Sequence, residues 1–197
     1  MSALIQAENL ELFTPAGRVL AHPLNFKISA GELLLIEGPN GAGKSTLLRT
    51  LLGLHSRFKG HLQSHIANTE ISYLPQLGNV QFFLPMNLGD VIRLEKAHSQ
   101  EDIEKLKLLT AKQIQAAWNS ASGGERQKAL LSRILLSPAK LIVLDEPLNH
   151  LDQDGRESVQ HAVQQLLQHG KAVTIVSHNT EWQAAKVQKL KLELRHS

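Results

Sequence analysis

The sequence predicts an α/β fold built on a mainly parallel sheet with crossover helices. Two continuous apolar runs, at residues 33–36 and 141–144, and a run at residues 172–176 that only Thr174 interrupts indicate buried strands. Such runs are typical of parallel strands that are covered by helices on both faces. Stretches with helical periodicity alternate with these runs, which favours parallel strands joined by helical crossovers. A glycine-rich segment, residues 38–43, follows the first run directly, as in a strand–loop–helix unit.

The first elements lead into and out of this glycine-rich segment. Apolar and polar residues alternate over residues 24–29, which predicts a half-buried strand. After the buried strand at residues 33–36, residues 46–52 have a helical pattern. Residues 70–75 then indicate another short strand, which Pro75 ends.

Helical patterns dominate the rest of the chain between the remaining strands. Residues 99–109 are predicted to form a helix with Ser99 as its N-cap. A longer helix starts near Ser122 and stops before Pro138. The helix after residue 150 ends at Gly170, and residues 190–194 alternate as expected for a half-exposed strand.

The composition is that of a globular protein and excludes several classes. Apolar residues make up 42% and charged residues 20% of the 197 residues. No apolar stretch approaches the roughly 18 residues that a membrane span needs, and the N-terminus lacks the pattern of a secretory signal. Without cysteine, the chain has neither a disulfide framework nor a thiolate metal site. A net charge of +3 with scattered basic residues gives no reason to expect a nucleic-acid partner.

The residues from Gly38 to Ser45 read GPNGAGKS and match the phosphate-binding loop pattern G-x-x-x-x-G-K-[ST]. Strand, loop and helix together aim backbone N–H groups and the positive end of a helix at one point. Lys44 is expected to reach the β- and γ-phosphates of a nucleotide, and the Ser45 hydroxyl to bind Mg²⁺. The candidate nucleotide-binding residues here are Gly38, Asn40, Gly41, Ala42, Gly43, Lys44, Ser45 and Thr46.

Two carboxylates, Asp145 and Glu146, follow the apolar run 141–144. In phosphate-loop enzymes an aspartate at this point helps to hold Mg²⁺, and Glu146 is placed to orient or deprotonate a water molecule. His178 follows the next strand. Because ligands bind at the carboxyl ends of parallel strands, we expect these side chains and the phosphate loop to converge.

A second glycine pair opens the long helix, within the sequence Ser122-Gly123-Gly124-Glu125. A serine and two glycines at a helix N-terminus form a possible anion-binding site. One chain rarely needs two phosphate-binding sites for one nucleotide. The second site makes sense if it binds nucleotide that another subunit holds.

Together these segments resemble the motifs of the ATP-binding subunits of ABC transporters. Residues 38–45 resemble the Walker A motif, residues 141–146 the Walker B motif with its catalytic glutamate, and residues 122–125 the signature motif. Residues 73–76 resemble the Q-loop, and Leu151-Asp152 resembles the end of the D-loop. His178 resembles the switch histidine, and Phe13 falls where the family has an aromatic residue that stacks on adenine.

The resemblance covers nearly the whole chain and implies how it is organised. It implies a P-loop NTPase of ABC type with one ATPase domain over residues 1–197. Residues 1–76 and 138–197 would form the core and an N-terminal antiparallel β lobe. Residues 77–137 would form a short helical lobe.

A mechanism with ATP and Mg²⁺ is also implied by the resemblance. Two subunits, by default two copies of this chain, would enclose two ATP molecules head to tail. Ser45, Gln76 and Asp145 would hold Mg²⁺, while Glu146 would activate water. Lys44 and His178 would contact the phosphates. The further residues implied at the nucleotide are Phe13, Gln76, Ser122, Gly123, Gly124, Glu125 and Asp152.

Four residues, in three segments of the chain, are noted as departures from the family pattern. Ala121 replaces the usual leucine before the signature serine, and we expect this change to be tolerated because the serine and glycines contact the phosphate. Asn149-His150 replaces the common Ser-Ala before Leu-Asp, which bears on signalling between subunits. Asn179 follows His178 where aspartate is usual.

By this resemblance the chain would power a separate integral-membrane permease from the cytoplasmic face of the cell membrane. Residues 71–92 are most similar to ATPases of bacterial zinc and manganese importers, whereas heme-exporter and lipoprotein-release ATPases are compact alternatives. A soluble ABC-type ATPase of DNA repair or translation is another alternative. Repair members place a long coiled coil between the Walker A and signature motifs, whereas the 78 residues from Lys44 to Ser122 leave no room for one. Translation members carry two ATPase domains in one chain, whereas this sequence has one set of motifs. The signature motif and His178 argue against a small-molecule kinase.

The remaining histidines and tryptophans are interpreted as structural. His61 and His65 have the spacing of a ligand pair on a helix, but Gly60 and its polar neighbours favour a hairpin without a metal site. Trp118 and Trp182 are predicted to be packing residues.

Overall fold

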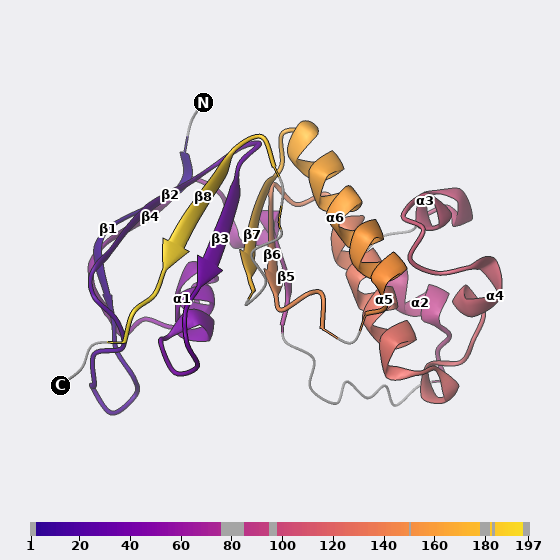
Figure 1. Cartoon of the computed structure of the whole chain (residues 1–197), viewed down its shortest axis with the longest axis horizontal. Coiled ribbons are helices and arrows are strands. Elements are labelled where there is room, and N and C mark those ends of the chain that lie inside the picture. Colours follow the sequence, from indigo (N-terminus) through magenta and orange to yellow (C-terminus); the bar gives the residue numbers. More distant parts are fainter. Residues whose placement is uncertain are drawn as a thin grey trace.

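The computed structural model describes residues 3–75, 85–94, 98–149, 151–177, 182 and 184–194. Its larger sheet has five strands in the order β5-β6-β7-β3-β8, and every neighbouring pair is parallel (Figure 1). The strands are β3 Leu33–Glu37, β5 Ile71–Leu74, β6 Leu141–Asp145, β7 Ala172–Val176 and β8 Val187–Lys191. The predicted parallel sheet is therefore confirmed.

Helices lie on both faces of this sheet, and the smaller ones gather at one end of the molecule (Figure 1). The α-helices are α1 Lys44–Leu51, α2 Leu88–Ile92, α3 Gln100–Lys105, α4 Ala111–Ile114, α5 Gly123–Leu135 and α6 Gln153–Gln168. Short 3₁₀ turns form at η1 Asn68–Glu70 and η2 Trp118–Ser120. Within the described residues, no helix is long and apolar enough to span a membrane.

The central strands are stable because their side chains meet apolar neighbours on both faces of the sheet. Leu33 and Leu35 belong to one apolar cluster, whereas Leu34 and Ile36 belong to a second. The first cluster includes the apolar sides of α5 and α6, and the second includes that of α1. Trp118 and Trp182 are buried in the first cluster, which confirms that they are packing residues.

A separate antiparallel sheet of three strands lies beside β8 (Figure 1). Its strands are β1 Ala3–Leu12, β2 Leu24–Ser29 and β4 Phe58–Ser64, in the order β2-β1-β4. The half-buried strand predicted at residues 24–29 is thus confirmed. An antiparallel bridge between Ala21 and Leu194 links the segment between β1 and β2 to the segment after β8.

The hairpin predicted around Gly60 is wrong, because residues 58–64 form one strand paired with β1. Gly60 has a φ of +90° and stands where the register between the two strands shifts. A Cβ atom at Gly60 would lie 2.1 Å from the carbonyl oxygen of Asn9. The glycine therefore permits a β-bulge within a strand and does not form a turn.

The helix predicted over residues 99–109 is shorter than expected. Ser99 is its N-cap, as predicted, because its side chain accepts a hydrogen bond from the N–H of Asp102. The helix α3 ends at Lys105, and Lys107 has a φ of +55°. Left-handed backbone at Lys107 is incompatible with continuing the α-helix.

Candidate active site

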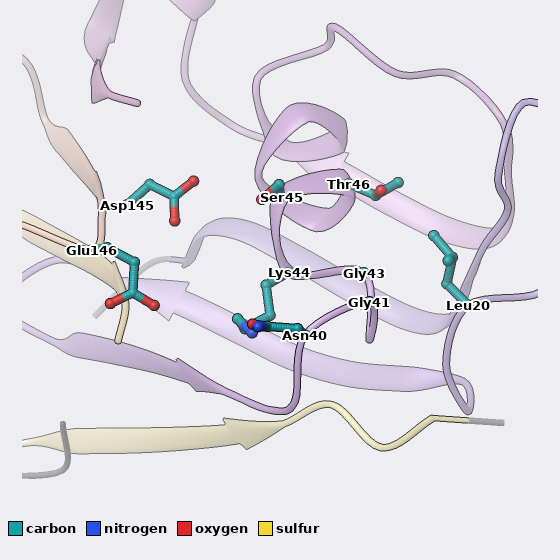
Figure 2. Close-up of a pocket in the computed structure, with 9 residues that line it drawn as sticks. All are labelled: Leu20, Asn40, Gly41, Gly43, Lys44, Ser45, Thr46, Asp145 and Glu146. Atoms are coloured by element: carbon teal, nitrogen blue, oxygen red, sulfur yellow. The ribbon is translucent and has the colours of Figure 1, made fainter. Parts of the chain in front are cut away.

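The end of β6, the phosphate loop and the start of α1 enclose a pocket of about 300 Å³. Figure 2 shows the carboxylates of Asp145 and Glu146 on the side opposite Lys44 and Ser45. The residues lining this pocket are Leu20, Asn40, Gly41, Gly43, Lys44, Ser45, Thr46, Asp145 and Glu146. All of them except Leu20 are among the residues that the sequence motifs single out. The expected convergence of the loop with both carboxylates is therefore present.

The conformation of the phosphate loop depends on Gly43, the residue before α1. Its φ is +96°, in the left-handed region that favours glycine. A Cβ atom at Gly43 would lie 3.1 Å from the Cβ of Leu20. Leu20 is a pocket residue that sequence reasoning missed. Its position against the loop results from tertiary packing, and it belongs to no local motif.

Lys44 lies inside the curve of the phosphate loop. Its side chain is almost fully buried, and Nζ donates to the carbonyl oxygens of Gly38 at 2.7 Å and Pro39 at 3.0 Å. An ammonium group has three N–H bonds, so these two contacts leave one for an anion in the pocket. The loop thus holds a positive charge where a phosphate would lie. Gly38 contributes its carbonyl group to this arrangement, and the side chain of Ala42 is packed into the second apolar cluster.

The two carboxylates extend from the carboxyl end of β6. Asp145 is buried, and it is paired in register with Val176 of β7. The pKa of Tyr73 on the neighbouring strand is raised, chiefly by burial and further by the negative charge of Asp145. The pocket therefore has a negative side formed by β6, opposite the positive side formed by Lys44.

Glu146 has an unusual backbone conformation for a residue with a Cβ atom. Its φ is +51°, and its N–H donates to the carbonyl oxygen of Val176 at 2.9 Å. A left-handed residue of this kind costs about 1–2 kcal/mol relative to the right-handed conformation. Such strain is found most often at functional sites, where the surrounding structure maintains it. The strand β7 maintains it here through Val176.

The second glycine segment lies apart from this pocket and begins α5. Ser122 is the N-cap, and its side chain accepts from the N–H of Glu125 at 3.2 Å. One carboxylate oxygen of Glu125 accepts from both the N–H and the hydroxyl of Ser122, and the other accepts from Gln113 at 3.1 Å. These hydrogen bonds, led by that from the N–H of Ser122, lower the pKa of Glu125. Gly123 is open, since a Cβ there would meet nothing within 4 Å.

Other predicted site residues lie elsewhere. Phe13 is half-buried and does not line the pocket; the Nζ of Lys59 lies 5.5 Å from its ring centroid. Asp152 is the N-cap of α6. Gln76 and His178 lie outside the described residues, as do His150 and Asn179. No cluster of three or more metal-ligating His, Asp or Glu side chains occurs in the described part of the chain, which includes His61 and His65.

A family model described as ABC transporter matches residues 21–149. The chain belongs to the ABC transporter family. A relative in Acinetobacter baylyi, named zinc import ATP-binding protein ZnuC, is 35% identical over 186 residues, which are 91% of this chain and 69% of the relative. As a member of this family, the chain is an ABC-type ATPase.

Solved structures of ABC proteins share the same fold. One, an ATP binding subunit of an ABC transporter, aligns with a TM-score of 0.78 at 19% identity, over 96% of this chain and 88% of that chain. Another is an inward-facing transporter assigned to the metal-chelate type of ABC transporter. It aligns with a TM-score of 0.77 at 26% identity, over 98% of this chain and 81% of that chain. The ABC-type fold expected from the sequence is thus confirmed.

Proposed function

We propose that this ABC ATPase hydrolyses ATP in the pocket at its phosphate loop and thereby powers a separate membrane permease. The observation that carries the proposal is the convergence of Lys44, Ser45, Asp145 and Glu146 on one pocket. Phosphoryl transfer to water uses groups of these kinds: a positive group at the phosphates, a hydroxyl and a carboxylate for Mg²⁺, and a further residue that positions the water molecule. The permease would be reached from the cytoplasmic face of the cell membrane.

The donor set of the pocket suits Mg²⁺. The hydroxyl of Ser45 and the carboxylate of Asp145 line the same pocket, and Mg²⁺ prefers oxygen ligands. We propose that they hold the ion together with Gln76. When bound, Mg²⁺ neutralises charge on the phosphate oxygens.

The remaining steps use groups of the chain itself. Two N–H bonds of the Lys44 ammonium group donate to loop carbonyl oxygens, and the third donates to a phosphate oxygen. The backbone N–H groups at the start of α1 donate to the phosphates as well. Glu146 accepts a proton from the attacking water. His178 contacts the γ-phosphate, and Phe13 stacks on the adenine if the segment around it moves toward the pocket on binding.

The second glycine segment supports an arrangement of two copies. Ser122, Gly123 and Gly124 do not line the pocket of their own chain, and the space around Gly123 is open. We propose that two copies bind head to tail, so that this segment of each copy contacts the ATP that the other copy holds. Glu125 and Asp152 lie close to that second contact by the same proposal. ATP binding would close the pair, and hydrolysis would open it.

The cargo is proposed to be a metal ion such as zinc or manganese. Two findings support this class: one relative is named as a zinc import ATP-binding protein, and one solved structure with the same fold is assigned to the metal-chelate type. The similarity of residues 71–92 to metal-importer ATPases points in the same direction.

The substitution Glu146→Gln tests the hydrolytic part of this proposal. The amide cannot accept the proton, so we expect ATP hydrolysis to fall by about 10² or more, the usual scale for a lost general base. ATP binding, measured by equilibrium dialysis, should be retained. Near-normal hydrolysis by this variant would remove Glu146 from the role of general base.

Purification of the Glu146→Gln protein with ATP from a mild-detergent extract of its native cell tests the partner. A polytopic membrane protein identified by mass spectrometry would support the transporter, and its pore residues would narrow the cargo. Recovery of soluble partners alone, or of ribosomes or nucleic acid, would instead indicate a soluble ABC-type ATPase.

A further inference from the structure

The first residue of the phosphate loop, Gly38, lies directly against Leu192, which follows β8. The N–H of Leu192 donates to the carbonyl oxygen of Glu37 at 2.8 Å. A Cβ atom at Gly38 would lie 2.5 Å from the carbonyl oxygen of Leu192 and 3.2 Å from its Cβ. The two residues therefore approach each other so closely that only a glycine fits at the start of the loop.

The position of Gly38 matters because its carbonyl group holds the lysine of the pocket. The Nζ atom of Lys44 donates to this carbonyl oxygen at 2.7 Å, the shorter of its two contacts with the loop. Any shift of Leu192 that moves Gly38 also moves the oxygen that Lys44 contacts. Leu192 therefore acts on the ammonium group through one intervening residue, although no motif of the sequence includes it.

The other end of the phosphate loop is packed against Leu20 in a similar way. A Cβ atom at Gly43 would lie 3.1 Å from the Cβ of Leu20, and Figure 2 shows the two residues beside each other. Gly43 is the residue directly before Lys44, where α1 begins. The loop is therefore held at one end by the segment after β8 and at the other by the segment between β1 and β2.

These two segments are joined to each other. Ala21, the residue after Leu20, forms an antiparallel bridge with Leu194, which lies two residues after Leu192. Ala21 and Leu192 are both buried in the second apolar cluster, and Leu194 packs against that cluster. The contacts thus form a closed path that starts at one end of the phosphate loop and returns to the other end.

We infer that residues 192–194 are a brace of the phosphate loop, and that Leu192 is a positioning residue for Lys44. The bridge to Ala21 makes the brace rigid, because it fixes the two ends of the loop relative to each other. A loop that already has its binding conformation loses less conformational freedom when a ligand binds. The brace therefore raises the affinity of the pocket for ATP. The inference rests on the proposed function, because it takes this pocket to be the ATP site.

The first test compares the affinity for ATP of two variants that lose the same side-chain atoms from the same apolar cluster. Leu192→Ala loosens the brace. Leu190→Ala is the matched control, because Leu190 is also buried in this cluster but is paired with Ile36 within the sheet. Leu192→Ala should raise the dissociation constant for ATP about tenfold, the effect of weakening one hydrogen bond to a charged group. Leu190→Ala should lose stability but keep an affinity close to that of the unmodified chain.

A disulfide across the bridge tests whether the brace acts through Ala21. The chain contains no cysteine, so Ala21→Cys together with Leu194→Cys introduces a single pair. Residues paired across an antiparallel bridge have Cα atoms about 4.5–5.5 Å apart, a separation that a disulfide can span. Oxidation of this pair in the Leu192→Ala protein should restore most of the affinity for ATP, and reduction of the same sample should remove it again. In the Leu190→Ala protein, oxidation should leave the affinity unchanged.

Each outcome distinguishes the brace from the proposed function. An unchanged affinity in Leu192→Ala would overturn the brace alone, as would an equal loss in Leu190→Ala or a loss that oxidation does not reverse. An unmodified chain that binds no ATP would overturn the proposed function together with the brace. Thermal unfolding without nucleotide shows whether each variant is folded. Leu192→Val removes less of the side chain and should weaken ATP binding in the same direction, so it replaces Leu192→Ala if that variant does not fold.

Discussion

At the scale of single residues, Gly43 and Gly17 offer a matched pair. Both have left-handed backbone, with φ of +96° and +82°, but a Cβ would contact Leu20 at Gly43 and nothing within 4 Å at Gly17. Gly17→Ala should therefore lower the free energy of unfolding by only the backbone cost, about 1–2 kcal/mol. Gly43→Ala should lower it by more, because the loop must shift away from Leu20.

Urea unfolding measures the free energy of unfolding of both variants. The affinity of the same samples for ATP shows whether the phosphate loop still binds nucleotide. We expect Gly43→Ala to weaken ATP binding by more than Gly17→Ala does. Equal stability losses and equal affinities in the two variants would show that the packing of Leu20 against the loop is unimportant.

The pocket shows which functional residues a sequence can and cannot predict. Lys44, Ser45, Asp145 and Glu146 were predictable because loop and carboxylates each follow a buried strand, and parallel strands end at one edge of their sheet. Leu20 was not, because it reaches the loop through a packing contact with no local pattern. The roles assigned to Gln76, His178 and Phe13 stay predictions.

At the scale of secondary-structure elements, the start of α5 has a titratable cap. Glu125 accepts three hydrogen bonds, and its pKa lies below the usual value of 4.5. Because this pKa is lower in the folded state, ionised Glu125 stabilises the folded state relative to the unfolded state. This stabilisation is complete above about pH 4.5 and is lost as the pH falls through the lower pKa of the folded state.

The variant Glu125→Gln checks this pH dependence, because glutamine keeps an accepting oxygen but does not titrate. The unmodified chain should lose stability relative to the variant as urea midpoints are measured from pH 6 down to pH 3. A difference between the two that is constant over this range would contradict the assignment.

Elements buried on both faces were more predictable than elements shaped by distant contacts. The strands β3, β6 and β7 have sequences in which nearly every residue is apolar, so their burial leaves little ambiguity. Gly60 was misinterpreted, because a glycine in a polar stretch fits a turn and a bulge equally well. The contact that decides between them is with Asn9 of β1. The early end of α3 at Lys105 likewise has no signal in the local periodicity.

At the scale of the whole molecule, the pocket should link nucleotide binding to global stability. A ligand that binds only the folded state at 100 times its dissociation constant adds about 2.7 kcal/mol. For a domain of this size that corresponds to a rise in Tm of roughly 5–10 °C. We expect this rise for the Glu146→Gln protein with ATP and Mg²⁺, measured by calorimetry.

Removal of Mg²⁺ with EDTA should reduce the rise in Tm, because Asp145 then meets the phosphates without a cation between them. AMP should give little stabilisation, since it lacks the phosphates that Lys44 is proposed to hold. Equal stabilisation by AMP and ATP would contradict the proposed placement of the phosphates in this pocket.

Alternate side chains of β6 pack into two different apolar clusters, and this division bears on how the sequence can change in evolution. Val143 packs into the cluster that includes α1, whereas Leu144 packs into the cluster that includes α5. Alternate residues of the central strands belong to one cluster or to the other. Substitutions can therefore accumulate among the helices on one face while the residues that support the phosphate loop stay the same.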